Sequence, residues 1–130
     1  MAIIREEHLV RHGSIAAGED IDIATYDRIG RRGGDANLVL CEADDFGVFL
    51  ILESSSEGDQ TNVAYLGANG FRAQLALGGS GSKGEKLAVG ADGVILSAGI
   101  GYAAEAEDVI GVALEDWTDS DLTEYDLYKV

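Results

Sequence analysis

The fold is decided by three stretches in the last third of the chain: residues 84–89 (GEKLAV), 91–96 (ADGVIL) and 108–116 (DVIGVALED). Each holds a short apolar run of strand length, and glycine-bearing turns separate the runs. Glycine reaches positive φ at little steric cost, so the Asp92-Gly93 pair is typical of a tight turn between antiparallel strands. These stretches predict a small β-module.

The rest of the chain repeats this pattern. Residues 21–25 and 74–77 alternate apolar and polar side chains, as half-buried strands do, whereas residues 46–52 (FGVFLIL) read as one fully buried strand. With 18 glycines and no proline, the turns depend on glycine. A second hairpin is predicted at Asn69-Gly70, and because two-residue turns cannot join parallel strands, the sheet is expected to be antiparallel.

Helical candidates are few and short. Residues 3–12 show an amphipathic scatter of apolar side chains, and residues 100–108 are rich in alanine. We therefore predict an all-β domain, a small antiparallel β-barrel or β-tulip-like sandwich with little helix.

The composition limits the partners. The 130 residues suit one domain, and the formal net charge of −15 repels phosphate backbones and anionic lipids, so neither nucleic acid nor membrane is an expected partner. The sequence shows no signal-peptide pattern and no apolar run of the ~20 residues that a bilayer span needs, so we expect synthesis in a cytoplasm. The single cysteine, Cys41, suits a small buried hydrophobic position. Adaptation to high salt is another possible origin of the acidity.

The charge is unevenly distributed. Residues 1–34 hold five arginines against six acids, whereas residues 35–130 hold four basic residues against 18 acids. The chain is therefore divided into an N-terminal segment, 1–34, and a body, 35–130, within a single domain.

Formal matches to catalytic and ligand motifs lack the context that the chemistry needs. Residues 79–84 (GSGSKG) fit G-x-G-x-x-G, but a strand follows instead of the helix that would meet a pyrophosphate. His8 and His12 are four residues apart, yet a zinc site usually needs three or four protein ligands. We therefore expect no enzyme activity, no cofactor and no metal.

The acidic and aromatic C-terminal residues have two interpretations each. The acids at positions 116, 119, 121 and 124 are solvated carboxylates, or else a weak divalent site without the EF-hand order. Trp117 and Tyr125 anchor the last strand on the core, or else form an aromatic contact with another subunit.

The C-terminal part of the chain resembles the C-terminal half of the capsid cement or decoration proteins of tailed bacteriophages. The resemblance is carried by residues 84–96, 109–116 and the closing residues 127–130 (LYKV). This resemblance implies a compact β-protein that binds the outer surface of an assembled viral head, often as a trimer. It also implies an extended N-terminal arm that orders on a neighbouring capsomer.

We therefore expect a structural decoration protein of the virion that stabilises the head by clamping adjacent capsid subunits. Its expected partners are the major capsid protein and further copies of itself in a homotrimer. The residues expected at the capsid or inter-subunit contact are all arginines of the N-terminal segment: Arg5, Arg11, Arg28, Arg31 and Arg32. The alternative is a small ligand-binding module using the loop at 78–84, or a calcium-dependent adhesion module.

Overall fold

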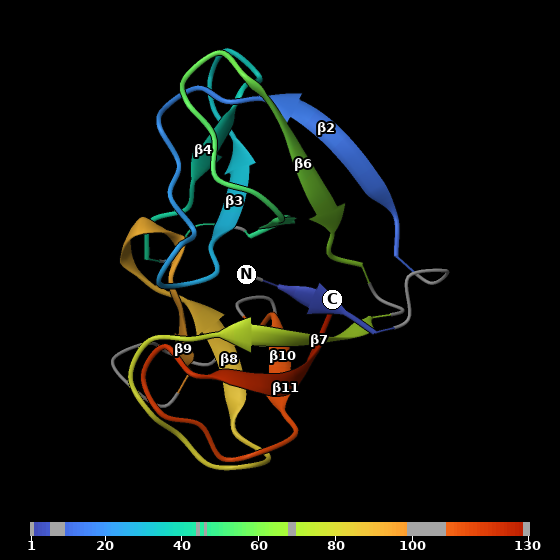
Figure 1. Ribbon diagram of the computed structural model, residues 1–130, viewed down its shortest axis with the longest axis vertical. Coiled ribbons are helices and arrows are strands. Elements are labelled where there is room, and N and C mark those ends of the chain that lie inside the picture. Colours follow the sequence, from blue (N-terminus) through green and yellow to red (C-terminus); the bar gives the residue numbers. More distant parts are fainter. Residues whose placement is uncertain are drawn as a thin grey trace.

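The computed structural model describes residues 2–5, 10–43, 45, 47–67, 70–98 and 109–128. They form two antiparallel sheets, shown one above the other in Figure 1. Sheet A has the order β1 (Ile3–Ile4), β7 (Phe71–Ala76), β11 (Leu122–Leu127), β10 (Gly111–Ala113), β8 (Lys86–Val89) and β9 (Ile95–Ser97). Sheet B has the order β2 (His12–Ala16), β6 (Gln60–Tyr65), β5 (Phe49–Ile51), β3 (Ile29–Arg32) and β4 (Leu38–Leu40). The prediction of an all-β antiparallel fold is confirmed, and since the sheets do not close into a barrel, the fold is a β-sandwich.

The main hydrophobic core lies between the sheets. Alternation along the strands sends one set of side chains inward, so Leu50 and Ala64 of sheet B meet Leu75 and Leu127 of sheet A in one buried cluster. Cys41 is fully buried in this cluster, as the sequence predicts.

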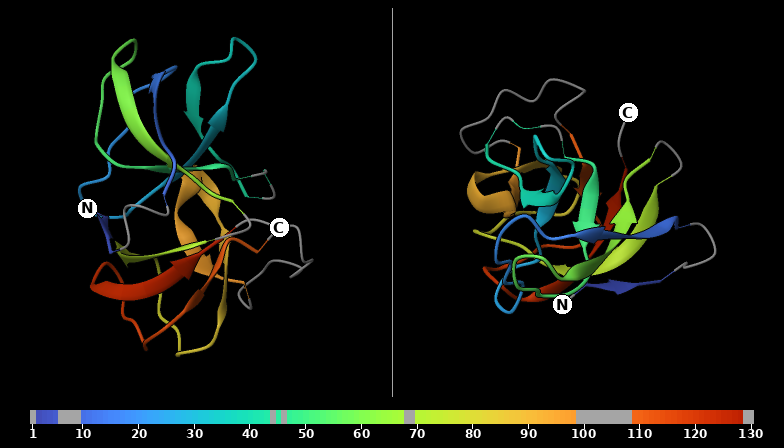
Figure 2. Two further views of the ribbon diagram at one scale, coloured as in Figure 1. Left: turned by 90° about the vertical axis from the view of Figure 1, so that its right-hand side faces the viewer. Right: turned by 90° about the horizontal axis from the view of Figure 1, so that it is seen from above.

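A second buried cluster lies on the other side of sheet B. It contains Ile15 of β2, Val63 of β6, Ile51 of β5 and Leu38 of β4, so it joins strands from both ends of the sheet. In the left view of Figure 2, the β2–β6 pair and the β3–β4 pair project from the body as two prongs. This cluster connects the prongs, and the short bridge between Ala17 and Leu38 adds a backbone contact between them.

The predicted buried strand and one predicted hairpin are confirmed. β5 is buried along its whole length at the centre of sheet B. β8 and β9 pair in the register Val89 to Ile95, and the 3₁₀ turn η2 (Ala91–Gly93) joins them. Loop 79–84 leads into strand β8, so no helix opens at the glycine motif.

Two other predictions are wrong. Ile3–Ile4 form strand β1 and His12 begins strand β2, so no helix spans residues 3–12, of which 6–9 lie outside the described part. The strands on either side of Asn69-Gly70, β6 and β7, belong to different sheets and do not form a hairpin. The candidate helix at 100–108 lies outside the described residues, within which no helix is long and apolar enough to span a bilayer.

The N-terminal segment is built into the body in the isolated chain. Its described residues supply β1 to sheet A, and β2 and β3 to sheet B. The predicted division at residue 34 falls in the turn between β3 and β4, two paired strands of one sheet. An arm that reaches a neighbouring capsomer stays a prediction, and it would require strands to leave these sheets.

Candidate functional site: an arginine and aromatic surface on sheet B

Two aromatic rings pair on sheet B. The register places Phe49 of β5 opposite Tyr65 of β6, and their ring centroids lie 5.0 Å apart at an interplanar angle of 80°. This edge-to-face geometry is favourable for aromatic pairs. Gly13 of β2 makes room for the Tyr65 ring, because a Cβ at this position would lie 2.6 Å from its Cε2 atom.

A guanidinium lies over each ring. The Cζ atom of Arg11 is 4.7 Å from the centroid of Tyr65, and that of Arg32 is 5.9 Å from the centroid of Phe49. Arg32 also donates from Nη1 to the carbonyl of Ala36 at 2.8 Å. Each exposed cation–π contact contributes about 0.5–1 kcal/mol. We call these four residues, Arg11, Arg32, Phe49 and Tyr65, the arginine–aromatic surface.

The arginine–aromatic surface is suited to binding carboxylates. Both arginines are exposed, and within the described part of the chain neither lies within ion-pair distance of a carboxylate. A guanidinium stacked on a ring keeps its N–H edge available for a bidentate bond to a carboxylate. Arginine and tyrosine are also enriched in protein interfaces.

The other three predicted contact arginines lie elsewhere and are engaged. Arg5 forms an ion pair of 2.9 Å with Glu124 on sheet A, and Arg31 forms one of 2.9 Å with Asp45. The pKa of Asp45 is lowered by the N–H of Glu42 and by the Arg31 guanidinium. Arg28 donates from Nη1 to the carbonyl of Asp92 at 2.9 Å. The structure thus brings Arg11 and Arg32 onto one surface and does not bring the full set of five together.

The predicted aromatic contact residues lie in the core. Trp117 is 3% exposed and Tyr125 is fully buried, and their rings pack edge to face at 5.8 Å. Burial raises the pKa of Tyr125 to about 12. These rings anchor strand β11, so in this structure they are not available for contact with another subunit.

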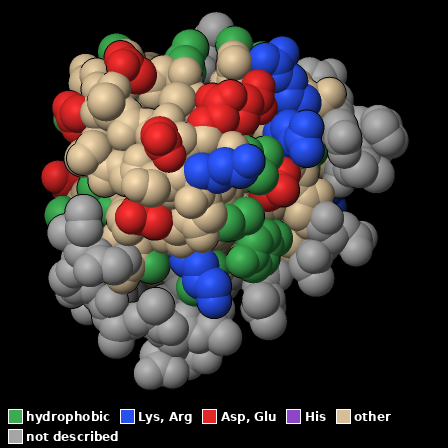
Figure 3. Space-filling view, turned by 90° about the horizontal axis from the view of Figure 1, so that it is seen from below, with side chains coloured by type: hydrophobic (Ala, Val, Ile, Leu, Met, Phe, Trp, Pro, Cys, Tyr) green, Lys and Arg blue, Asp and Glu red, His purple; other side chains and the backbone are tan. Residues whose placement is uncertain are grey.

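The C-terminal acids hold loops together. Asp116 accepts the N–H of Lys83 at 2.8 Å, and Asp119 accepts the N–H of Gly79 at 2.8 Å. No group of three or more potential metal ligands occurs in the described residues. His12 lies on strand β2, and His8 lies outside the described part. The molecular face in Figure 3 shows acidic and basic side chains interspersed, and hydrophobic side chains are exposed on the same face.

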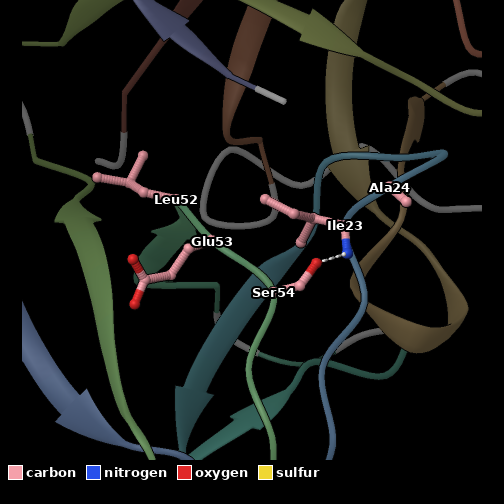
Figure 4. A pocket seen from close by; sticks show the side chains of 5 residues that line it. All are labelled: Ile23, Ala24, Leu52, Glu53 and Ser54. Atoms are coloured by element: carbon pink, nitrogen blue, oxygen red, sulfur yellow. Dashed lines mark hydrogen bonds between the residues drawn. The ribbon is translucent and has the colours of Figure 1, made fainter.

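A small open pocket lies beside the end of β5. Its volume is about 310 Å³, and it is lined by Ile23, Ala24, Leu52, Glu53 and Ser54 (Figure 4). The polar groups are already engaged, since Ser54 Oγ accepts the N–H of Ile23 at 2.9 Å and Glu53 accepts from Asn62 at 3.0 Å. The pocket is separate from loop 78–84, where the sequence placed the alternative ligand site.

Sequence reasoning found the arginines and missed the aromatic half of the surface. Phe49 belongs to the predicted buried strand, and Tyr65 belongs to a predicted strand before Asn69-Gly70. Which residue lies opposite which depends on the strand register, and a slip of one residue would send each side chain to the other face. No local signal in the sequence supplies that register.

The fold is similar to one solved structure in particular, described as the head fiber gp8.5 N base of bacteriophage phi29. The TM-score is 0.65 at 18% sequence identity, and the likeness covers 94% of this chain and 98% of that chain. The likeness therefore extends over nearly the whole of both chains. No family model and no curated protein sequence matches the chain.

Proposed function

We propose that this chain is a structural protein of a bacteriophage head, which binds the outer surface of the assembled head through the arginine–aromatic surface. The observation that carries this proposal is the fold, which matches that of a phage head fiber base over 94% of the chain. A match over the whole sandwich has more weight than a match to one hairpin, because hairpins recur in many unrelated folds.

The arginine–aromatic surface supplies the binding chemistry. Arg11 and Arg32 direct positive charge outward from a chain whose net charge is −15. That charge is complementary to carboxylates on a capsid protein, and the partly exposed Tyr65 ring adds apolar contact area, whereas Phe49 is buried beneath it at 4% exposure. Weak contacts of this kind become strong when many copies, or a homotrimer, bind a repeating lattice. Clamping of adjacent capsid subunits would follow if one molecule bridged two of them.

The test is co-sedimentation of the purified chain with heads that were assembled without it. We expect saturable binding, with a copy number set by the symmetry of the head. The double variant Arg11→Ser/Arg32→Ser is expected to bind at least tenfold more weakly, which is a loss of about 1.4 kcal/mol in the binding free energy of one chain. The double variant also loses two cation–π contacts, so it should be less stable by about 1–2 kcal/mol, and binding is compared well below the melting temperature of both chains.

A matched control separates the effect of net charge from the effect of the arginine–aromatic surface. The variant Arg72→Ser/Lys83→Ser also removes two positive charges, but from exposed positions outside sheet B. It should bind heads as the wild type does. Equal weakening in both double variants would mean that net charge alone governs binding, and absence of wild-type binding would refute the proposed function. The solution mass of the chain, measured in the same samples, tests the predicted homotrimer.

A further inference from the structure

The described strands give the sandwich four edges, which differ in length. Sheet A ends in β1 and β9, which have 2 and 3 residues, and sheet B ends in β2 and β4, which have 5 and 3 residues. An edge strand presents unpaired N–H and C=O groups that can pair with another chain, and natural proteins usually shorten or cover such edges. β2 is the longest edge that this sandwich presents.

Two of the shorter edges are partly covered by the chain itself. On β4, the carbonyl of Leu38 accepts the N–H of Gly18 at 2.7 Å, and the N–H of Leu40 donates to the Glu19 carboxylate at 3.2 Å. On β9, the carbonyl of Ile95 accepts the N–H of Gly78 at 3.0 Å. These contacts occupy backbone groups that an added strand would need at the two edges.

Among the described residues, none covers the outer side of β2. In the antiparallel ladder with β6, the carbonyl of Arg11 accepts the N–H of Tyr65 at 2.8 Å, so alternate residues beginning with Arg11 bond to β6. His12 and Ser14 therefore direct their backbone N–H and C=O groups away from the sheet. No described residue bonds to these groups, and β2 lies at the rim of the molecule in Figure 1.

The charge beside this edge indicates which chemistry fits it. Arg11 directly precedes β2, its guanidinium lies over Tyr65, and His12 is exposed. A segment paired with β2 would meet Arg11 at one end, where a carboxylate forms a charge-assisted hydrogen bond. If a second copy paired through its own β2, Arg11 and His12 would meet the same basic residues, so that pairing offers no complementary charge at this edge.

We propose that β2 accepts an added strand: an extended segment of the capsid protein pairs with His12 and Ser14 and places an Asp or Glu side chain against Arg11. This inference rests on the proposed function and specifies how the binding occurs. In strand addition the main-chain hydrogen bonds supply affinity, and the alternating side chains supply specificity. Arg11 then serves both the added strand and the arginine–aromatic surface.

The test changes one outward N–H. In Ser14→Pro the added ring removes the donor on the open side and leaves the ladder to β6 intact, because proline is tolerated on an edge strand when its nitrogen faces solvent. Ser14→Ala is the matched control, since it removes the hydroxyl that donates to Gln60 and keeps the N–H. We expect Ser14→Pro to bind assembled heads at least tenfold more weakly than the wild type, and Ser14→Ala to bind as the wild type does.

Hydrogen exchange supplies a second measurement that needs no variant. In the free chain, the amides of His12 and Ser14 should exchange fast, whereas those of Gly13 and Ile15, which face β6, should be protected. Binding to heads should protect the peptide that contains His12 and Ser14. This measurement decides the question if Ser14→Pro fails to fold.

The outcomes separate the two proposals. Wild-type binding that Ser14→Pro leaves unchanged would overturn strand addition and leave the head-binding function standing. Protection of His12 and Ser14 in the free monomer would also overturn it. Self-association that Ser14→Pro abolishes would make a second copy the occupant and overturn the assignment to a capsid segment. Absence of any wild-type binding would refute the function and this inference together.

Discussion

Single carboxylates determine much of the loop structure. Both carboxylate oxygens of Asp119 accept from the Tyr26 hydroxyl, at 3.0 and 2.9 Å, and one also accepts the N–H of Gly79. The hydrogen bond to Asp119 raises the pKa of Tyr26 above 10.0. One side chain thus joins three segments that are far apart in the sequence. An acid that could be a calcium ligand by composition thus serves here as an acceptor for a backbone N–H and a hydroxyl.

Asp27 leads to a prediction about pH. It is fully buried, and it accepts the N–H of Ala76 at 2.8 Å. Burial raises its pKa above 3.8, although the N–H groups of Ala76 and Ala2 oppose this shift. The folded state therefore holds the Asp27 proton more tightly than the unfolded state does. This stabilisation is complete below pH 3.8 and is lost as the pH rises through the folded pKa.

The variant Asp27→Asn should remove that loss. Its free energy of unfolding relative to the wild type should increase from pH 4 to pH 7, by about 1.4 kcal/mol for each unit of the pKa shift. Urea titrations at several pH values measure this difference. Asp22→Asn, which makes the same charge change at an exposed position, is the control. Parallel pH profiles for Asp27→Asn and the wild type would contradict the prediction.

Hairpins show how far local sequence determines the elements. Asp92-Gly93 joins strands that pair, whereas Asn69-Gly70 joins strands that enter different sheets. The N–H of Gly70 donates to the carbonyl of Gly67 at 3.2 Å, as is usual where a chain reverses. Turn chemistry thus predicts where the chain reverses. The pairing depends on distant strands, because β7 finds β11 and β1, and β6 finds β2 and β5.

The η2 turn leads to a prediction about Gly93. Its φ is +73°, and an added Cβ would lie 2.3 Å from the carbonyl oxygen of Ile29. Gly93→Ala would therefore combine left-handed strain with a clash against backbone, and we expect it to destabilise the fold by at least ~2 kcal/mol in urea unfolding. Gly34→Ala is the control, because nothing lies within 4 Å of its Cβ position and its φ is not positive. A loss of less than about 0.5 kcal/mol for Gly93→Ala, the range of ordinary surface substitutions, would refute this account.

For the whole molecule, the sequence predicts the fold class but not which strands pair with one another. Alternation and glycine turns predict antiparallel strands, and the structure has them. The integration of residues 1–34 was not predictable in the same way, because it depends on distant pairings: β1 pairs with β7 in sheet A, and β3 pairs with β5 in sheet B as well as with its neighbour β4. The arginines could be found from charge alone. Their surface could not, because it needs the register that aligns Phe49 with Tyr65.

Net charge leads to the last prediction. At pH 7 the chain carries 15 excess negative charges, and the three ion pairs of the described residues are partly exposed, so solvent weakens each of them. Salt weakens these pairs and also screens the repulsion among the excess acids, since the Debye length falls from ~30 Å at ~0.01 M to ~3 Å at ~1 M.

Because the excess acids outnumber the pairs, we expect the melting temperature at pH 7 to rise with NaCl. A gain of ~1 kcal/mol corresponds to roughly 3–5 °C for a chain of this length. Near pH 4.2, the isoelectric point from the sequence, the self-repulsion largely disappears and the rise should disappear with it. A fall in melting temperature with salt at pH 7 would mean that the ion pairs outweigh the repulsion. If the chain instead unfolds altogether at low salt, its folded state depends on screening of the repulsion among its acids. That result would show that the acidity is an adaptation to high salt.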